Sequence, residues 1–205
     1  MDAAKLQLKI YATPDSARTL DRELCVPVFH RWIKQKTLPE MVIDVASYSH
    51  VPNGPGIVLI GHGSDYFMDE GEGRLGLLHN RKRAGFAPDA RLEDLARRTL
   101  NAAALLEGDL SLTGKLKFAT GELLFRINDR LAAPNTDATF AAVKPELEAL
   151  GNKLYGGACA LARVGDAKQL FAVRISGESA PLATLLILSR GALAPVRPRR
   201  SYFST

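Results

Sequence analysis

Hydrophobic and polar residues along the first 36 positions predict a strand followed by two helical segments. Residues 5–12 alternate apolar and polar side chains, which is the period of a half-buried strand. A helix start is predicted next, capped by Asp15 or Ser16, because short polar side chains satisfy the free amides at that point. Apolar residues then recur at helical spacing, and Pro27 fits the first turn of the second segment.

The following stretch predicts a sheet of three strands, over residues 41–49, 56–63 and 74–83. The first is rich in β-branched residues, and the second is a continuous apolar run typical of a buried strand. In the third, Leu77 and His79 share one face, because side chains alternate along a strand.

The second half of the chain alternates helical periodicity with short runs typical of strands. Helices are predicted from Pro88 to Gly108, from Asn135 to Gly156 and over 180–190. Strands are predicted over 115–119, 121–128, 158–164 and 169–176, with a tight turn at Thr120-Gly121 between the first two. Pro145 falls inside the second helix, where a proline must kink the helix or restart it.

These elements, in the order βααβββα-ββαββα, predict an α+β fold with packed helices and a largely antiparallel or mixed sheet. Most strands follow one another too closely for the long crossovers that parallel pairs need. We expect a single domain over residues 1–191 and a basic C-terminal tail at 192–205. If the chain forms two subdomains, the boundary falls within 84–114.

The composition is that of an ordinary globular protein, with 46% hydrophobic and 24% charged residues. It excludes a disordered, collagen-like or coiled-coil chain. The N-terminus lacks the features of a signal peptide, and no apolar run reaches the roughly 18 residues of a membrane span. We therefore expect a cytoplasmic protein that does not enter a membrane.

The net charge of +5 suggests a nucleic-acid partner, but the distribution of the charge argues against one. Both signs alternate along the body of the chain, whereas Arg197, Arg199 and Arg200 lie in the tail without an acidic residue. A nucleic-acid surface would need a basic stripe on one folded face. We expect a small ligand or a protein as the partner, with a homo-oligomer as one option.

Glycine is concentrated between residues 54 and 76, which hold seven of the 17 glycines of the chain. Because glycine lets a backbone approach a ligand or another strand closely, this segment is the candidate binding region. The residues assigned to ligand binding are Gly61, His62, Gly63, Ser64, Asp65, Arg81 and Arg83. The alternative is that the glycines mark hairpin turns and bends.

Three of the four histidines lie on or beside the predicted three-strand sheet, and they form a candidate metal site: His50, His62 and His79. Neighbouring strands can bring imidazoles together when their register and facing agree. A slip of one residue in register turns a side chain to the other face, so the sequence leaves structural histidines as the alternative.

No phosphate loop and no nucleophile elbow accompanies these residues, and no motif indicates a cofactor. The leading hypothesis is therefore a non-catalytic module that binds a small ligand or a protein through the glycine-rich sheet. The alternative is a metal-dependent, hydrolase-like enzyme that uses the histidines of the 50–79 sheet with Asp65.

Overall fold

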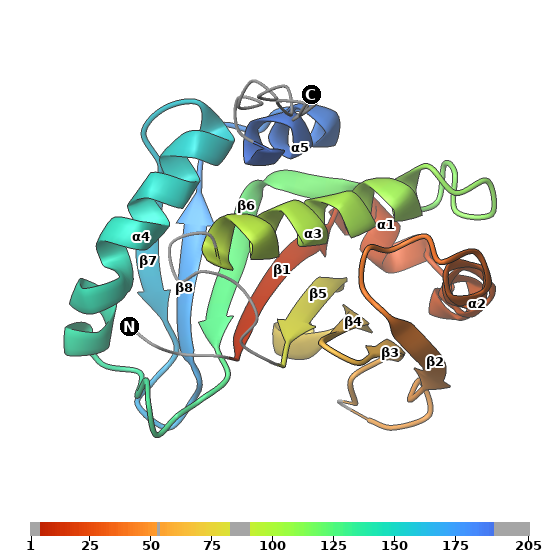
Figure 1. The fold of residues 1–205 in the computed structure, drawn as a ribbon, viewed down its shortest axis with the longest axis horizontal. Coiled ribbons are helices and arrows are strands. Elements are labelled where there is room, and N and C mark those ends of the chain that lie inside the picture. The colour runs from red at the N-terminus through yellow and green to blue at the C-terminus, as the bar shows by residue number, and fades with distance from the viewer. Residues whose placement is uncertain (1–4, 53, 83–90, 191–205) are drawn as a thin grey trace, which may run out of the picture.

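The computed structural model describes residues 5–52, 54–82 and 91–190 (Figure 1). Arg83, the predicted helix start at Pro88 and the predicted tail 192–205 lie outside these ranges. The strands are β1 (Leu6–Ala12), β2 (Val42–Ser47), β3 (Ile57–Gly61), β4 (Ser64–Asp69), β5 (Gly76–Arg81), β6 (Phe118–Ile127), β7 (Ala160–Val164) and β8 (Phe171–Ser176). The helices are α1 (Pro14–Thr19), α2 (Cys25–Gln35), α3 (Arg91–Glu107), α4 (Asp137–Tyr155) and α5 (Leu182–Arg190), with short 3₁₀ helices η1 (Arg22–Leu24) and η2 (Gly71–Gly73).

The eight strands of the described ranges form one antiparallel sheet in the order β2-β3-β4-β5-β1-β6-β8-β7. Figure 1 shows its twist, since β7 and β8 stand upright in the view while β3 and β4 lie nearly flat. β1 comes first in the chain and lies in the middle of the sheet, between β5 and β6. The predicted α+β fold with a largely antiparallel sheet is confirmed.

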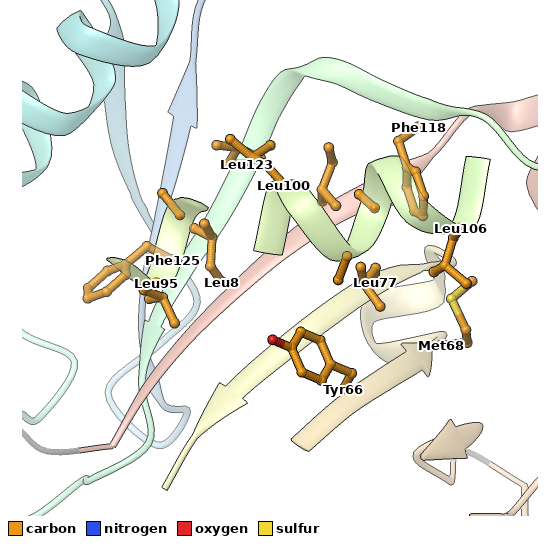
Figure 2. Packing of buried hydrophobic residues seen from close by; sticks show 14 of the residues in the cluster. Leu8, Tyr66, Met68, Leu77, Leu95, Leu100, Leu106, Phe118, Leu123 and Phe125 are labelled. Atoms are coloured by element: carbon orange, nitrogen blue, oxygen red, sulfur yellow. The ribbon is translucent and has the colours of Figure 1, made fainter. Parts of the chain in front are cut away.

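All five helices contribute to one hydrophobic core on one face of the sheet. α3 contacts β1 and β5, α4 contacts β7 and β8, and α2 contacts β2 and β3. Figure 2 shows the centre of this core, where Leu95 and Leu100 of α3 lie over Leu8, Leu77 and Phe125 of the strands. Burying this apolar surface, at about 25 cal/mol per Å², holds the helical layer on the sheet. None of the helices in the described part of the chain is long and apolar enough to cross a membrane.

The prediction of three strands between residues 41 and 83 is wrong, because the structure has four there. The missed strand is β4, which pairs with β5 and places Tyr66 opposite His79 and Met68 opposite Leu77. Its polar ends, Ser64 and Asp69, leave only a short apolar centre. That pattern is too brief to distinguish a strand from a loop.

The predicted hairpin over 115–128 is also wrong, because β6 is one continuous strand. Its register against β1 shifts between Ile10 and Tyr11, as at a β-bulge. A Cβ atom at Gly121 would lie 2.5 Å from Ser179 Oγ, so the glycine permits a close approach of two chain segments rather than a turn.

Two helices differ in detail from their predictions. α1 is capped by Thr13, whose Oγ1 accepts a hydrogen bond from the amide of Ser16, instead of by Asp15 or Ser16. α4 begins after its cap Thr136, ends at Gly156 and contains Pro145 without restarting.

The face of the sheet opposite the core carries no α-helix in the described ranges, only the short η2, and we call it the helix-free face. Because side chains alternate along strands, Gln7, Lys9 and Tyr11 of β1 point to it, while Leu6, Leu8 and Ile10 point into the core. A small apolar cluster forms there from Tyr11, Leu124 and Ala172, with Val164 packed against it. The helix-free face is otherwise mostly polar near its centre.

Candidate functional site

Five of the residues predicted to bind ligand, Gly61 to Asp65, form the tight connection between β3 and β4. Asp65 Oδ1 accepts hydrogen bonds from the Gly61 amide at 3.2 Å and from Lys82 Nζ at 2.7 Å. Asn80 Nδ2 donates to Asp65 Oδ2 at 3.4 Å. The carboxylate of Asp65 therefore holds this connection together.

The other predicted ligand residues do not share one face with Asp65. Ser64 and Arg81 are paired across β4 and β5 and point to the helical layer, where Arg81 Nη1 donates to the carbonyl of Arg91 at 3.5 Å. Asp65 points to the helix-free face, and His62 is exposed at the connection. A Cβ atom at Gly61 would lie 2.4 Å from the carbonyl oxygen of Ser64, so this glycine serves the tight chain reversal.

The structure does not bring the three candidate metal-binding histidines together. His50 lies before β3 and His62 directly after it, so they lie at opposite ends of one strand, both exposed. His79 is fully buried on the helical side. Within residues 5–52, 54–82 and 91–190, no group of three or more His, Cys, Asp or Glu side chains could hold a metal ion.

His79 is a neutral histidine within the core. Its ring stacks on Tyr66 with centroids 4.5 Å apart, and its Nδ1 lies 3.1 Å from Thr99 Oγ1. Since Thr99 donates its own proton to the carbonyl of Leu95, Nδ1 carries the hydrogen of the histidine. Burial lowers the pKa of His79 to about 3, so the ring is uncharged near neutral pH.

On the helix-free face, Lys9 is an amine removed from water. It is 0% exposed, and its Nζ donates to Asp69 Oδ2 at 2.5 Å and to the carbonyl of Gly71 at 3.0 Å. Burial lowers the pKa of Lys9, while the adjacent Asp69 opposes that shift. A Cβ atom at Gly76 would lie 3.0 Å from Lys9 Cε, so the glycine leaves room for the lysine stem to reach Asp69.

Beside Lys9, a cavity of about 490 Å³ lies over β1, β6 and β8. Its floor is the apolar cluster of the helix-free face. Its polar lining consists of three arginines, one each from the β4–β5 connection, β6 and β8, together with a phenol, a carboxylate and an amide. We call this cavity the arginine pocket, and its defining residues are Tyr11, Arg74, Leu124, Arg126, Val164, Ala172 and Arg174.

Each arginine of the pocket has a carboxylate partner in the structure. Arg126 pairs with Glu72, while Arg74 Nη1 lies 2.5 Å and Arg174 Nε 3.4 Å from Glu122. Arg174 and Arg74 remain nearly half exposed, with 44% and 45% of their side chains accessible, whereas Arg126 is 13% exposed.

Tyr11 connects these pairs. Its ring lies 3.6 Å from the guanidinium carbon of Arg74, a cation–π contact, and its hydroxyl donates to Glu72 at 3.3 Å. Burial raises the pKa of Tyr11 and lowers the pKa of Arg126. The phenol keeps its proton at neutral pH, and the guanidinium keeps its charge because its ordinary pKa is so high.

The glycine-rich segment builds a second cavity, of about 720 Å³, at the other end of β3 and β4 from Gly61. Its lining includes four glycines of the segment and the two acidic residues of the β4–β5 connection. The full set of lining residues is Arg22, Tyr48, Ser49, Val51, Pro52, Gly54, Gly56, Glu70, Gly71, Glu72 and Gly73. Gly71 and Glu72 also line the arginine pocket, so η2 forms a wall shared by both cavities.

Sequence reasoning missed Lys9 and every defining residue of the arginine pocket. A signal was present, since Arg126 and Arg174 interrupt otherwise apolar strands, and Lys9 falls between Leu8 and Ile10. A charge inside such a strand points away from the core. Only the strand order β1-β6-β8, which the sequence does not show, brings these charges to one place.

No known protein family, curated protein or solved structure matches this chain.

Proposed function

We propose that this protein binds a small organic anion in the arginine pocket. The observation that carries the proposal is the convergence of Arg74, Arg126 and Arg174 around one cavity with an apolar floor. A guanidinium group donates two parallel hydrogen bonds to a carboxylate or a phosphate. The fixed spacing of its N–H groups matches the spacing of the oxygens in these acids.

The charge around the pocket favours an acidic ligand. Four cationic side chains, Lys9 and the three arginines, face the carboxylates of Asp69, Glu72 and Glu122. One positive charge is left over, and an acid group of the ligand would neutralise it. A low-dielectric floor strengthens this attraction compared with bulk water.

The floor favours a ligand with an apolar body. Leu124 and Ala172 are buried beneath the cavity, and Val164 and Leu170 border it. An aromatic or branched aliphatic group lying on this floor removes apolar surface from water, while its acid group reaches the arginines.

Binding, rather than catalysis, is what these groups supply best. Guanidinium groups remain protonated throughout the physiological range, and burial raises the pKa of the Tyr11 phenol. Such groups hold and orient a charge, whereas proton transfer near neutral pH needs a group whose pKa is close to 7.

The test is calorimetric titration of the purified protein at low ionic strength with benzoate and with phenyl phosphate. Inorganic phosphate and benzyl alcohol serve as probes that lack one of the two features. We expect the aryl anions to bind more tightly than either. Arg126→Gln should weaken phenyl phosphate binding by at least about tenfold, since a hydrogen bond to a charged group contributes about 1.5–3 kcal/mol.

Arg31→Gln is the matched control. Arg31 lies in α2, pairs with Asp109 at 2.5 Å and lines neither cavity, so the substitution removes the same charge away from the pocket. Failure of both aryl anions to bind, or equal affinities for wild type and Arg126→Gln, would overturn the proposal.

A further inference from the structure

The wall between the two cavities contains a residue in an unusual conformation. Glu72 has φ 65° and ψ 21°, the left-handed region that side chains with a Cβ adopt at a cost of about 1–2 kcal/mol. The other described non-glycine residue with positive φ is Lys36, which has the ordinary role of ending α2. A strained backbone conformation at a cavity wall indicates that the position of this side chain has a function.

The conformation places the Glu72 carboxylate in the arginine pocket. There it pairs with Arg126 and accepts a hydrogen bond from the Tyr11 hydroxyl, at 3.3 Å. These are the two groups that reach deepest into the pocket, since Tyr11 is buried and the Arg126 side chain is 13% exposed. The acid group of a bound ligand would use the same two donors.

The neighbours of Glu72 are held separately from it. The carbonyl of Gly71 accepts a hydrogen bond from Lys9 Nζ, and Glu70 pairs with Arg22 at 2.5 Å. Glu72 itself lies between two glycines, and nearly half of its side chain, 48%, is exposed. Its side chain can therefore leave the pocket while the preceding residues stay anchored.

We propose that Glu72 is an internal competitor that occupies the acid-binding subsite of the free protein and is displaced by the acid group of the ligand. This inference rests on the proposed function. Displacement removes one negative charge, so four cationic side chains then face two carboxylates. A doubly charged acid, such as a phosphate monoester, therefore suits the opened pocket better than a single carboxylate does.

The test compares phenyl phosphate binding to Glu72→Gln and to wild type by calorimetric titration. We expect the variant to bind about tenfold more tightly, because the amide no longer competes for Arg126 as a charge. Glu72→Ala, which removes the competing group entirely, should bind at least as tightly as Glu72→Gln. The preference for phenyl phosphate over benzoate should be visible in all three proteins.

Glu148→Gln is the control, because it makes the same change of charge on α4, at a half-exposed residue that lines neither cavity. Its affinity should equal that of wild type. If Glu72→Gln and Glu72→Ala bind no more tightly than Glu148→Gln while Arg126→Gln still binds more weakly, the competitor role is overturned and the binding function stands. If no variant binds phenyl phosphate or benzoate, the binding function itself is overturned.

Discussion

At the scale of single residues, the neutral His79 makes the stability of the fold sensitive to acid. The pKa of His79 is about 3 in the folded chain because the ring is buried, and about 6.5 for an ordinary histidine in the unfolded chain. As the pH falls from 6.5 towards 3, only the unfolded chain binds this proton. The free energy of unfolding therefore decreases over that window, by about 2 kcal/mol between pH 7 and pH 5.

Urea denaturation of wild type and His79→Gln at several pH values measures this effect. The variant is expected to lose stability at pH 7 and to show a shallower decline towards pH 5. His30→Gln, at an exposed position of α2, should keep the wild-type slope. Equal slopes for wild type and His79→Gln would show that the acid sensitivity lies elsewhere.

His79 also shows how far alternation along a strand predicts a residue. The period of two correctly placed His79 on the same face as Leu77. It could not show that α3 covers this face, which makes the histidine a core residue rather than a metal ligand candidate near the surface. For Lys9 the same alternation gives the opposite face, but the partner Asp69 depends on β4, a strand that the pattern does not reveal.

At the scale of elements, α4 contains two residues whose replacement by alanine should have opposite effects. Pro145 is exposed within the helix, and it lacks the amide hydrogen that an interior residue donates. Pro145→Ala should raise the free energy of unfolding by about 1–3 kcal/mol.

At Gly151 a Cβ atom would lie 2.3 Å from Cys159 Sγ, so Gly151→Ala should lower the free energy of unfolding by about 1–3 kcal/mol.

Urea midpoints at constant m-value check both changes. Lys144→Ala, at the exposed position before Pro145, should shift the free energy of unfolding by no more than about 0.5 kcal/mol. A loss of stability in Pro145→Ala would mean that the proline is required where it stands. A gain in Gly151→Ala would mean that α4 can move away from Cys159 without cost.

The elements that sequence periodicity placed correctly are those with long or strongly apolar patterns, such as α3, β1 and β3. The errors at β4 and β6 have a common physical cause. In β4 the two aspartates form ion pairs with lysines distant in sequence: Asp69 pairs with Lys9, and Asp65 pairs with Lys82. In β6 the glycine that suggested a turn accommodates the segment around Ser179. Both depend on contacts that form only in the folded sheet.

At the scale of the whole molecule, one sheet and one continuous core predict cooperative unfolding. The single tryptophan, Trp32, lies in α2 and packs on Phe29, so its fluorescence monitors the β2 end of the sheet. Far-ultraviolet circular dichroism monitors all helices and strands together. If residues 1–191 form a single domain, the two signals should change at the same urea concentration. Separate transitions would instead support two subdomains divided within 84–114.

The arginine pocket, like cooperative unfolding, depends on the fold of the whole molecule. Tyr11 and Leu124 lie 113 positions apart in the sequence and Leu124 and Ala172 lie 48 apart, and the three residues meet because β6 lies between β1 and β8. The sequence predicts the class of fold from local patterns. The order of strands in the sheet, which determines this pocket, follows from packing over the entire chain.

The shared wall of the two cavities has a thermodynamic consequence. Because Gly71 and Glu72 line both cavities, a molecule that displaces them in one cavity also changes the lining of the other. A molecule filling the 720 Å³ cavity would thus change the affinity of the arginine pocket for its own occupant. Linkage requires that each occupant change the affinity for the other by the same factor, so the two shared residues would couple two separate binding equilibria.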